Sequence, residues 1–186
     1  MTPDDFHNGD EGYTGLLGKD RVPKFDRRIE ALGAVDESTA ALGLARVQVK
    51  SPETIRVLLQ VQHDLYTLMT EIAATPENVE KFRAIGTDKV KWLETTIKEF
   101  EQRVKMPVEF IIPGDSLPGA ALDLARTVIR RAERRVVELT HTGDVQNFNL
   151  VRYLNRASNL CYTLEMFENS LAGHDHPTLA KNLSEK

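Results

Sequence analysis

The sequence predicts an all-α protein, an antiparallel bundle of five helices in one domain. In five stretches, hydrophobic residues recur three and four positions apart, the spacing that aligns them along one face of a helix. Proline, glycine and short polar residues separate these stretches, and the connections are short. Strand patterns do not alternate with the helical ones, so helices packed on helices are the expected architecture.

The links between the periodic stretches carry the signals that set the helix ends. Ser51 and Pro52 provide an N-cap and a proline suited to the first helical position, so the second helix is expected to start there. Asp88 can cap the third helix, and residues 142–144 form the expected turn before the fifth. The predicted helices span about residues 26–49, 52–75, 88–104, 118–140 and 147–172.

Both ends of the chain and one internal link fall outside this pattern. Residues 1–25 are rich in Gly, Asp and other polar residues, so we expect a loop that is ordered by itself or by a ligand. Residues 106–116 are mostly apolar and indicate a packed connection, whereas the polar tail from Gly173 is expected to be flexible. The chain thus divides into an N-terminal segment (1–25), a helical domain (26–172) and a tail (173–186).

Composition and charge exclude several classes of function. The net charge of −4 gives no global positive field for nucleic acid or an anionic membrane. Cys161 is the single cysteine, which rules out an intramolecular disulfide, suits a reducing compartment and predicts a small core residue. The N-terminus lacks a secretory pattern, and no run of about 18 apolar residues could span a membrane. We therefore expect a cytoplasmic protein that binds neither nucleic acid nor membrane.

Two motifs for phosphate or metal fail on their spacing. Residues 12–19 faintly resemble a Walker A loop, but Gly12 and Gly18 are one residue too far apart, and Asp20 stands where Ser or Thr should hold magnesium. A di-iron bundle needs two Glu-x-x-His pairs, and Glu138 with His141 forms one. No transition metal bound by the protein alone is expected.

The fourth predicted helix carries five arginines and one glutamate within ten residues. At about 100° per residue, Arg126, Arg130 and Arg134 fall within one third of the helix circumference, together with Asp123 and Glu133. This arginine stripe borders the apolar arc instead of lying opposite it. Arginines beside a core need partners, and a polyphosphate matches their paired donors. A solvated face with internal Arg–Glu pairs is the alternative for the stripe alone.

Several motifs follow one another along nearly the whole chain. They read GDxGxT, RVxK, RxE, GxxDE, FIxPG, ARTxxRRAER and YLNR, at residues 9–14, 21–24, 28–30, 33–37, 110–114, 125–134 and 153–156. In this order the chain resembles the PduO-type ATP:corrinoid adenosyltransferases, the cobalamin adenosyltransferase family. The arginine-rich block followed by YLNR is the most specific part of the resemblance.

The resemblance implies a ferritin-like five-helix bundle that assembles as a homotrimer and binds ATP between neighbouring subunits. It implies transfer of the 5′-deoxyadenosyl group of ATP to the cobalt of cob(I)alamin, with Mg²⁺ held by the triphosphate and water. A flavoprotein reductase and an adenosylcobalamin-dependent enzyme are the implied partners. Position by position, it places ATP on Asn8, Gly9, Thr14, Gly15, Lys24, Arg130, Arg131, Glu133, Arg134 and Asn155.

The resemblance also implies residues that act on the reaction itself. Asp36 and Arg126 are expected to form an ion pair across the subunit interface, beside the ATP ligand Arg130. Phe110 is expected beneath the corrin ring, where it excludes water and the lower axial base. From the residues alone, a phenylalanine before two isoleucines is equally a candidate for the hydrophobic core, so both positions of Phe110 stay open.

The chain departs from the family pattern on the corrinoid side. Asp123 stands where a histidine is usual, Asn159 where an aspartate is usual, Ser38-Thr39 where Leu-Asn is usual, and Asp115 where a second glycine follows Pro-Gly. These differences leave two alternatives. One is a non-catalytic paralogue that binds ATP or a corrinoid as a carrier or sensor. The other is a structural helical trimer whose arginines only join subunits.

Overall fold

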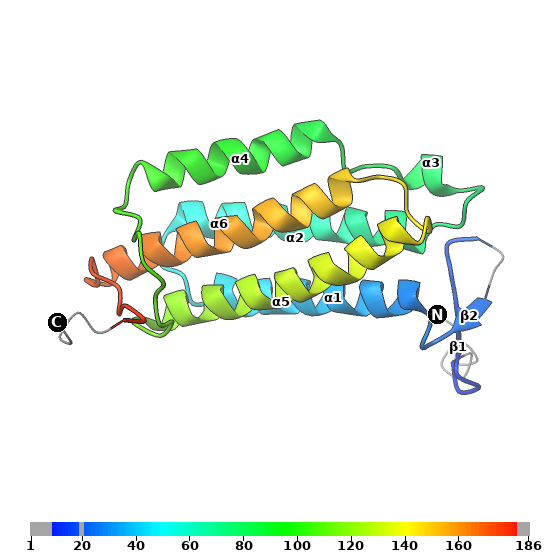
Figure 1. Cartoon of the computed structure of the whole chain (residues 1–186), viewed down its shortest axis with the longest axis horizontal. Helices are drawn as coiled ribbons and strands as arrows, with labels where there is room; N and C mark the ends of the chain where they lie inside the picture. The colour runs from blue at the N-terminus through cyan, green and yellow to red at the C-terminus, as the bar shows by residue number, and fades with distance from the viewer. Residues whose placement is uncertain (1–8, 19–20, 182–186) are drawn as a thin grey trace.

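Five long helices run along one another, as the periodicity predicts (Figure 1). The structure is a computed structural model that describes residues 9–18 and 21–181. Its one-turn helix α3 (Val79–Phe82) is too short for a periodic pattern to predict. The long helices are α1 (Arg27–Arg46), α2 (Pro52–Ala73), α4 (Thr87–Glu101), α5 (Leu117–His141) and α6 (Asn149–Leu171).

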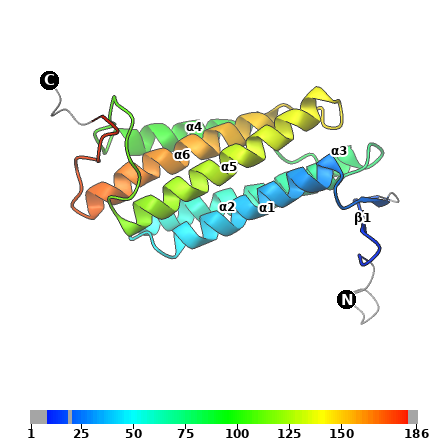
Figure 2. The same ribbon diagram turned by 60° about the horizontal axis from the view of Figure 1, so that its bottom comes forward.

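The long helices pack as neighbours in the order α2, α1, α5, α6 and α4 (Figures 1 and 2). Contacts between α2 and α6 close a four-helix core, and α4 packs on the outside of α6. Fully buried side chains come from every long helix, for example Leu42, Leu68, Phe100, Ile129 and Tyr153. In the described part of the chain, no helix is long and apolar enough to cross a membrane.

The residues that precede the helices explain where most of them begin. Asp26, Ser51 and Ser116 come before α1, α2 and α5, and each accepts a hydrogen bond from a backbone N–H in the first turn. The predicted cap at Asp88 is wrong. Helix α4 begins directly after Gly86, and Asp88 lies in its first turn, where a negative charge still favours the helix N-terminus.

The N-terminal segment contains a β-hairpin where the sequence indicates a loop. Strand β1 (Tyr13–Gly15) pairs antiparallel with β2 (Arg21–Pro23). Between them, Leu17 hydrogen-bonds through its backbone to the end of α2. A Cβ on Gly18 would lie 2.2 Å from Oγ1 of Thr75, so this close approach requires glycine. Strands of three residues have too little period to be recognised from sequence.

The chain after α6 folds back on the connection between α4 and α5. An isolated antiparallel bridge joins Leu179 to Ile111. Backbone hydrogen bonds run from Ala180 N–H to the Phe110 carbonyl (2.8 Å) and from Ile112 N–H to the Thr178 carbonyl (2.7 Å). The expected flexible tail therefore does not describe residues 174–181. A short segment that pairs with a distant part of the same chain carries no periodic signal in its own sequence.

Candidate functional site

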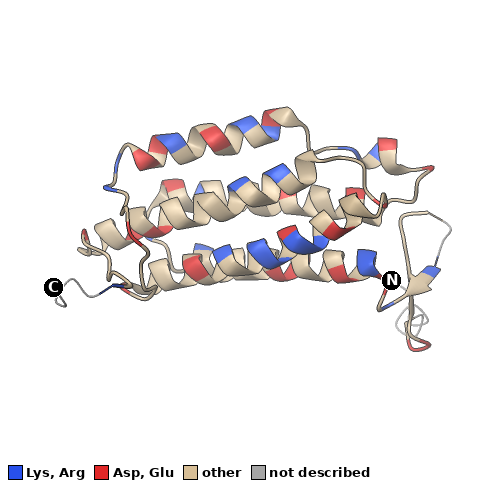
Figure 3. Ribbon diagram, viewed as in Figure 1, with Lys and Arg blue, Asp and Glu red and all other residues tan. Residues whose placement is uncertain are grey.

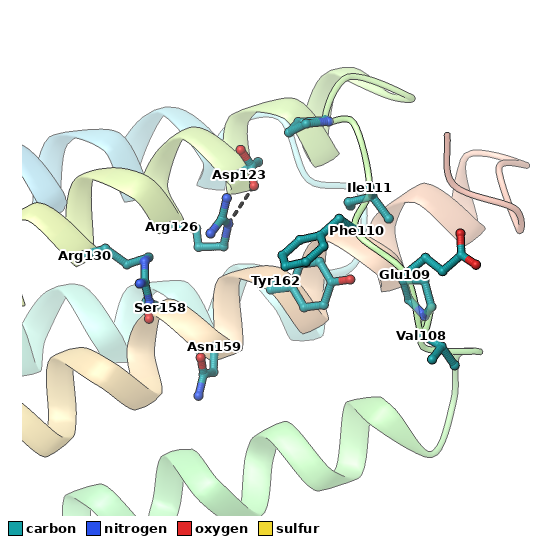
Figure 4. A pocket seen from close by; sticks show the side chains of 12 residues that line it. Val108, Glu109, Phe110, Ile111, Asp123, Arg126, Arg130, Ser158, Asn159 and Tyr162 are labelled. Atoms are coloured by element: carbon teal, nitrogen blue, oxygen red, sulfur yellow. Dashed lines mark hydrogen bonds and ion pairs between the residues drawn. The ribbon is translucent and has the colours of Figure 1, made fainter. Parts of the chain in front are cut away.

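A cavity of about 420 Å³ opens between the α4–α5 connection, α5 and α6 (Figure 4). The connection supplies an apolar wall, and the two helices supply charged and polar side chains. The lining residues are Pro107, Val108, Glu109, Phe110, Ile111, Pro113, Asp123, Arg126, Arg130, Ser158, Asn159 and Tyr162. The predicted site residues Phe110, Asp123, Arg126, Arg130 and Asn159 are thus brought together at one place.

Phe110 lies on the apolar wall of the cavity with 88% of its surface exposed. The alternative that Phe110 belongs to the hydrophobic core is therefore wrong. Val108, on the same connection, is fully exposed as well. Exposed apolar side chains gathered at a cavity wall offer a contact surface for a flat, largely apolar ligand.

An ion pair between Asp123 and Arg126 forms part of the cavity lining on α5 (Figure 4). Nε of Arg126 lies 2.6 Å from Oδ1 of Asp123, and the two residues share a helix face because they are three positions apart. Within one chain Arg126 is thus paired with Asp123. Asp36 is exposed on α1 and has no hydrogen bond or ion pair with any described residue. The ion pair between Asp36 and Arg126 across subunits stays a prediction.

A buried acid lies behind this ion pair. Glu165 on α6 is fully buried, and neither carboxyl oxygen has a hydrogen-bond partner among the described residues. Burial first, and then the charge of Asp123, raise the pKa of Glu165 to about 8, and Arg126 opposes the rise. One turn earlier, Cys161 is a core residue as predicted, and burial raises its pKa to about 12. The wall behind the cavity therefore holds a carboxyl group that is largely protonated at neutral pH.

The arginine stripe runs along α5 away from the cavity (Figure 3). Arg130 and Arg134 are exposed, and neither side chain has a hydrogen-bond or ion-pair partner among residues 9–18 and 21–181. Ile129 and Ala132, which flank the stripe, are fully buried. The stripe thus borders the core as predicted, with two guanidinium groups available to a ligand.

The other three α5 and α6 candidates are engaged with side chains of the same chain. Arg131 pairs with Glu37 of α1 in an exposed ion pair. Nδ2 of Asn155 donates a hydrogen bond of 2.9 Å to Oε1 of Glu133. The second contact fixes a polar pair across α5 and α6 beside the stripe, whereas the first is a surface pair of little stabilising value.

Four N-terminal candidates meet in the hairpin. Thr14 and Gly15 lie on β1, and Lys24 follows β2 and donates its backbone N–H to the Gly12 carbonyl (2.8 Å). The Lys24 ammonium lies close to Gly9, since a Cβ on Gly9 would be 2.8 Å from Nζ. Asn8, the remaining N-terminal candidate, lies outside the described residues.

The hairpin and the cavity lie at opposite ends of the bundle (Figure 1). Within one chain the structure therefore does not bring the hairpin candidates to Phe110 or Arg130. A site that uses both groups needs the hairpin of one chain beside α5 of another.

Sequence reasoning missed several residues around the cavity. Ser158 and Tyr162 line it together with Asn159, and their spacing of four on one helix face was a usable signal. Glu165 gave no signal, because its burial depends on the packing of α6 against α5. At the opposite end of the bundle, Arg28, inside one of the N-terminal motifs, donates to the carbonyls of Ile72, Ala74 and Asp144 and therefore holds that end together.

Metal-binding side chains do not cluster around the site. Within the described residues, no group of three or more His, Cys, Asp or Glu could hold a metal ion. A divalent cation would fit here only if a ligand such as a triphosphate supplied most of its coordination.

Fold and site together define a class of protein. It is a helical bundle in which unpaired arginines lead into a cavity with an exposed aromatic wall, and such a surface suits a ligand with an anionic part beside an apolar one.

Comparisons with known proteins identify the family. The family model described as cobalamin adenosyltransferase matches residues 6–168. The chain is 36% identical to the corrinoid adenosyltransferase PduO of Citrobacter freundii over 96% of its own length, and spans about half (51%) of that relative. It is also 36% identical to the cobalamin adenosyltransferase of Cupriavidus metallidurans, over 89% of this chain and 87% of the relative. The chain therefore belongs to the cobalamin adenosyltransferase family.

A solved structure agrees with this assignment. A variant of the PduO-type ATP:corrinoid adenosyltransferase from Lactobacillus reuteri, complexed with cobalamin and ATP, superposes with a TM-score of 0.86 at 30% identity. The match covers 95% of each chain. The five-helix bundle predicted from the sequence is thus confirmed as the fold of the family.

Proposed function

We propose that the protein transfers the 5′-deoxyadenosyl group of ATP to the cobalt of a reduced corrinoid and releases triphosphate. One observation carries this proposal: the unpaired Arg130 and the exposed Phe110 line the same cavity. An arginine suited to phosphate and an aromatic wall suited to a corrin ring lie where two such ligands would have to meet. Membership in the cobalamin adenosyltransferase family supports the same reaction.

ATP is expected to bind between the hairpin of one subunit and α5 of its neighbour. The hairpin would supply the backbone around Gly9 and Gly15, the Thr14 hydroxyl and the Lys24 ammonium. The neighbour would supply Arg130 and, beside it, the remaining arginines and the Glu133–Asn155 pair. Separation of these groups within one chain supports a homotrimer in which each site is shared. A clean monomer in sedimentation at tens of micromolar, with and without ATP, would contradict the shared site.

The reaction requires the protein to position its two substrates and to neutralise the charge of the leaving triphosphate. Cob(I)alamin, as substrate, attacks C5′ of ATP, a cobalt–carbon bond forms, and the bond from C5′ to the triphosphate oxygen breaks. The leaving triphosphate takes both electrons of that bond, so Arg130, Arg134 and Lys24 would stabilise the charge that develops on it. Mg²⁺ held by the phosphates would share this task, with no protein cluster required.

Phe110 would act on the cobalt before the transfer. A bulky apolar side chain beneath the ring leaves no place for water or the nucleotide base, because neither is stable against a dry surface. Cobalt without a lower ligand is easier to reduce to Co(I). The reductant is expected to come from a flavoprotein partner in the cytoplasm, and the product would pass to an adenosylcobalamin-dependent enzyme.

The deciding experiment combines the protein with Mg-ATP and cobalamin and follows the corrinoid absorbance. One assay starts from chemically prepared Co(I), and a second starts from Co(II) with a reductant that acts on the bound corrinoid. We expect turnover in both assays. Phe110→Ala should lose most turnover from Co(II) and recover much of it from Co(I). Phe148→Ala, at an exposed phenylalanine that does not line the cavity, is the matched control and should behave like the unaltered protein.

A second candidate is a non-catalytic paralogue that carries or senses ATP or a corrinoid. The corrinoid-side residues Asp123 and Asn159 favour it, since both depart from the family pattern and both line the cavity, with the buried Glu165 behind them. Calorimetric binding of ATP without turnover in either assay would support this candidate. Failure to bind ATP at all would leave only the structural trimer.

A further inference from the structure

The residues after α6 form a strap across the connection that carries Phe110. We define the strap as residues 174–181. Its backbone brackets Ile111: Ala180 N–H donates to the Phe110 carbonyl (2.8 Å), and Ile112 N–H donates to the Thr178 carbonyl (2.7 Å). These two bonds flank the bridge between Ile111 and Leu179. The residues on both sides of Ile111 are thus fixed in register with the strap.

A side-chain clamp locks the same register. Oδ2 of Asp115 accepts the backbone N–H of Thr178 (3.0 Å), and Oδ1 accepts its hydroxyl (2.7 Å). Both oxygens of one carboxylate are therefore used by one strap residue, and bonds to a charged acceptor are the stronger kind. Asp115 lies just before α5, so the clamp ties the strap to the rigid bundle at the end of the connection.

The other end of the strap is anchored to α6. The backbone N–H of His174 donates to the Asn169 carbonyl (2.9 Å), and the Ser170 hydroxyl donates to Oδ1 of Asp175 (2.6 Å). The strap is consequently held at α6 and, through Thr178, at Asp115, and the residues that follow Thr178 pair with the connection. Figure 1 shows this end of the chain beside the connection between α4 and α5.

Phe110 depends on its backbone for its position. Its side chain is 88% exposed, so no core packing holds it at the cavity wall. The connection from α4 to α5 is long and has no helix or strand of its own, and such segments are mobile unless they are tied down. The hydrogen bonds of the strap at the Phe110 carbonyl and the Ile112 amide tie down the backbone directly after the Phe110 side chain.

On the basis of the proposed function, we propose that Asp115 and Thr178 are positioning residues that hold Phe110 beneath the corrin ring through the strap. Neither residue lines the cavity, so neither would touch the corrinoid or ATP. Loosening the clamp leaves the bundle and the arginine stripe intact and lets Phe110 move away from the cobalt. The step that suffers is then the one that needs the lower face of the cobalt kept free of ligands.

The test uses the full chain with Asp115→Ala and, separately, Thr178→Val. Hydrogen exchange of the Ile112 amide should become roughly tenfold faster in Asp115→Ala, the scale of one lost hydrogen bond to a charged group. Turnover from Co(II) should fall roughly tenfold, and turnover from ready-made Co(I) should stay within about twofold, on the same scale. Thr178→Val should show smaller changes in the same direction, and Thr178→Ser, which keeps the hydroxyl, should restore them.

Thr142→Val is the matched control, because the Thr142 hydroxyl donates to the Asp144 carboxylate (2.6 Å) in the same way at the opposite end of the bundle. It should change neither the Ile112 exchange nor the ratio of the two turnover rates. Unchanged exchange in Asp115→Ala, or faster exchange with an unchanged ratio, would overturn the positioning role. Absence of turnover by the unaltered protein in both assays would instead contradict the proposed function, and the positioning role with it.

Discussion

Two buried carboxyl groups show how the two sides of the bundle differ. Asp64 on α2 is 2% exposed, and it accepts the Tyr153 hydroxyl (2.9 Å), the Gln60 amide (3.1 Å) and the Lys89 ammonium. Glu165 on α6 is fully buried and has no hydrogen-bond partner among the described residues. A buried carboxylate with partners links elements of the fold, whereas a buried carboxyl group without partners costs stability and marks a place where the fold serves another purpose. That place is directly behind the cavity.

The largest loss of stability is expected at Asp64, the buried carboxylate that has hydrogen-bond partners. Asp64→Ala leaves the Lys89 ammonium and the Tyr153 hydroxyl without their shared acceptor, and should lower the free energy of unfolding by about 3–5 kcal/mol. Denaturant unfolding measures this loss. Asp88→Ala, at an exposed acid near the same pair, should cost far less. Comparable losses of unfolding free energy in the two variants would mean that the contacts of Asp64 with Lys89 and Tyr153 do not stabilise the fold.

Glu165→Gln should raise the free energy of unfolding, and the size of this gain should depend on pH. The folded protein keeps the Glu165 proton up to about pH 8, whereas the unfolded chain releases it above the ordinary pKa of 4.5. Stability from this group is therefore lost as pH rises between these values, and Gln removes the loss. Relative to the unaltered protein, the variant should gain about 2–4 kcal/mol between pH 5 and pH 8.

The control for that measurement lies one turn further along α6. Glu168 is also fully buried, but its carboxylate accepts the backbone N–H groups of Lys50 (2.9 Å) and Ser51 (3.3 Å). Glu168→Gln keeps only one acceptor oxygen for these two N–H groups and should destabilise the protein. A pH-independent difference between Glu165→Gln and the unaltered protein would show that the Glu165 carboxyl is ionised in the fold.

Arg130→Lys should leave the free energy of unfolding unchanged and weaken the binding of ATP. The substitution keeps the charge but turns a two-pronged donor into a single ammonium, so we expect a loss of about 1.5–3 kcal/mol in binding free energy. Calorimetry at physiological salt measures it. Arg135→Lys is the matched change on α5, at an exposed arginine already near Glu138 (3.4 Å). Equal affinity in Arg130→Lys and the unaltered protein would mean that Arg130 faces solvent in the assembled site.

The smallest effect on stability is expected at Phe110. Its exposed side chain loses little on truncation, and Phe110→Ala should change the unfolding free energy by no more than about 0.5 kcal/mol. Phe100→Ala is the contrast, because Phe100 is 1% exposed and packs edge to face on Phe167. That variant should cost about 3–5 kcal/mol. The two variants, ten positions apart, would then show that Phe100 belongs to the core and that Phe110 belongs to the cavity wall.

The sequence was informative wherever a local pattern decides the structure. The five helices follow from a spacing of three and four, and the burial of Ile129 and Ala132 beside exposed Arg130 follows from the same geometry. The cap at Ser51 is equally local.

What the sequence could not predict depends on contacts between distant segments. The hairpin is held by the end of α2, the strap by Asp115, and the burial of Glu165 by α5. Phe110 is the clearest case: its apolar neighbours favour a core position, and only the path of the connection puts it on the surface. The pairing of Arg126 with Asp123 was accessible from their spacing, but a choice between two acidic partners needs the assembled protein.

The burial of Cys161 has a practical consequence for spectroscopy. It is the one cysteine in the sequence, it is 1% exposed, and burial raises its pKa to about 12, so it should not react with maleimide or iodoacetamide reagents in the folded state. A cysteine introduced at Val108 would then be the single reactive thiol of the molecule. A fluorophore or nitroxide attached there would report on the cavity wall without any prior removal of native thiols.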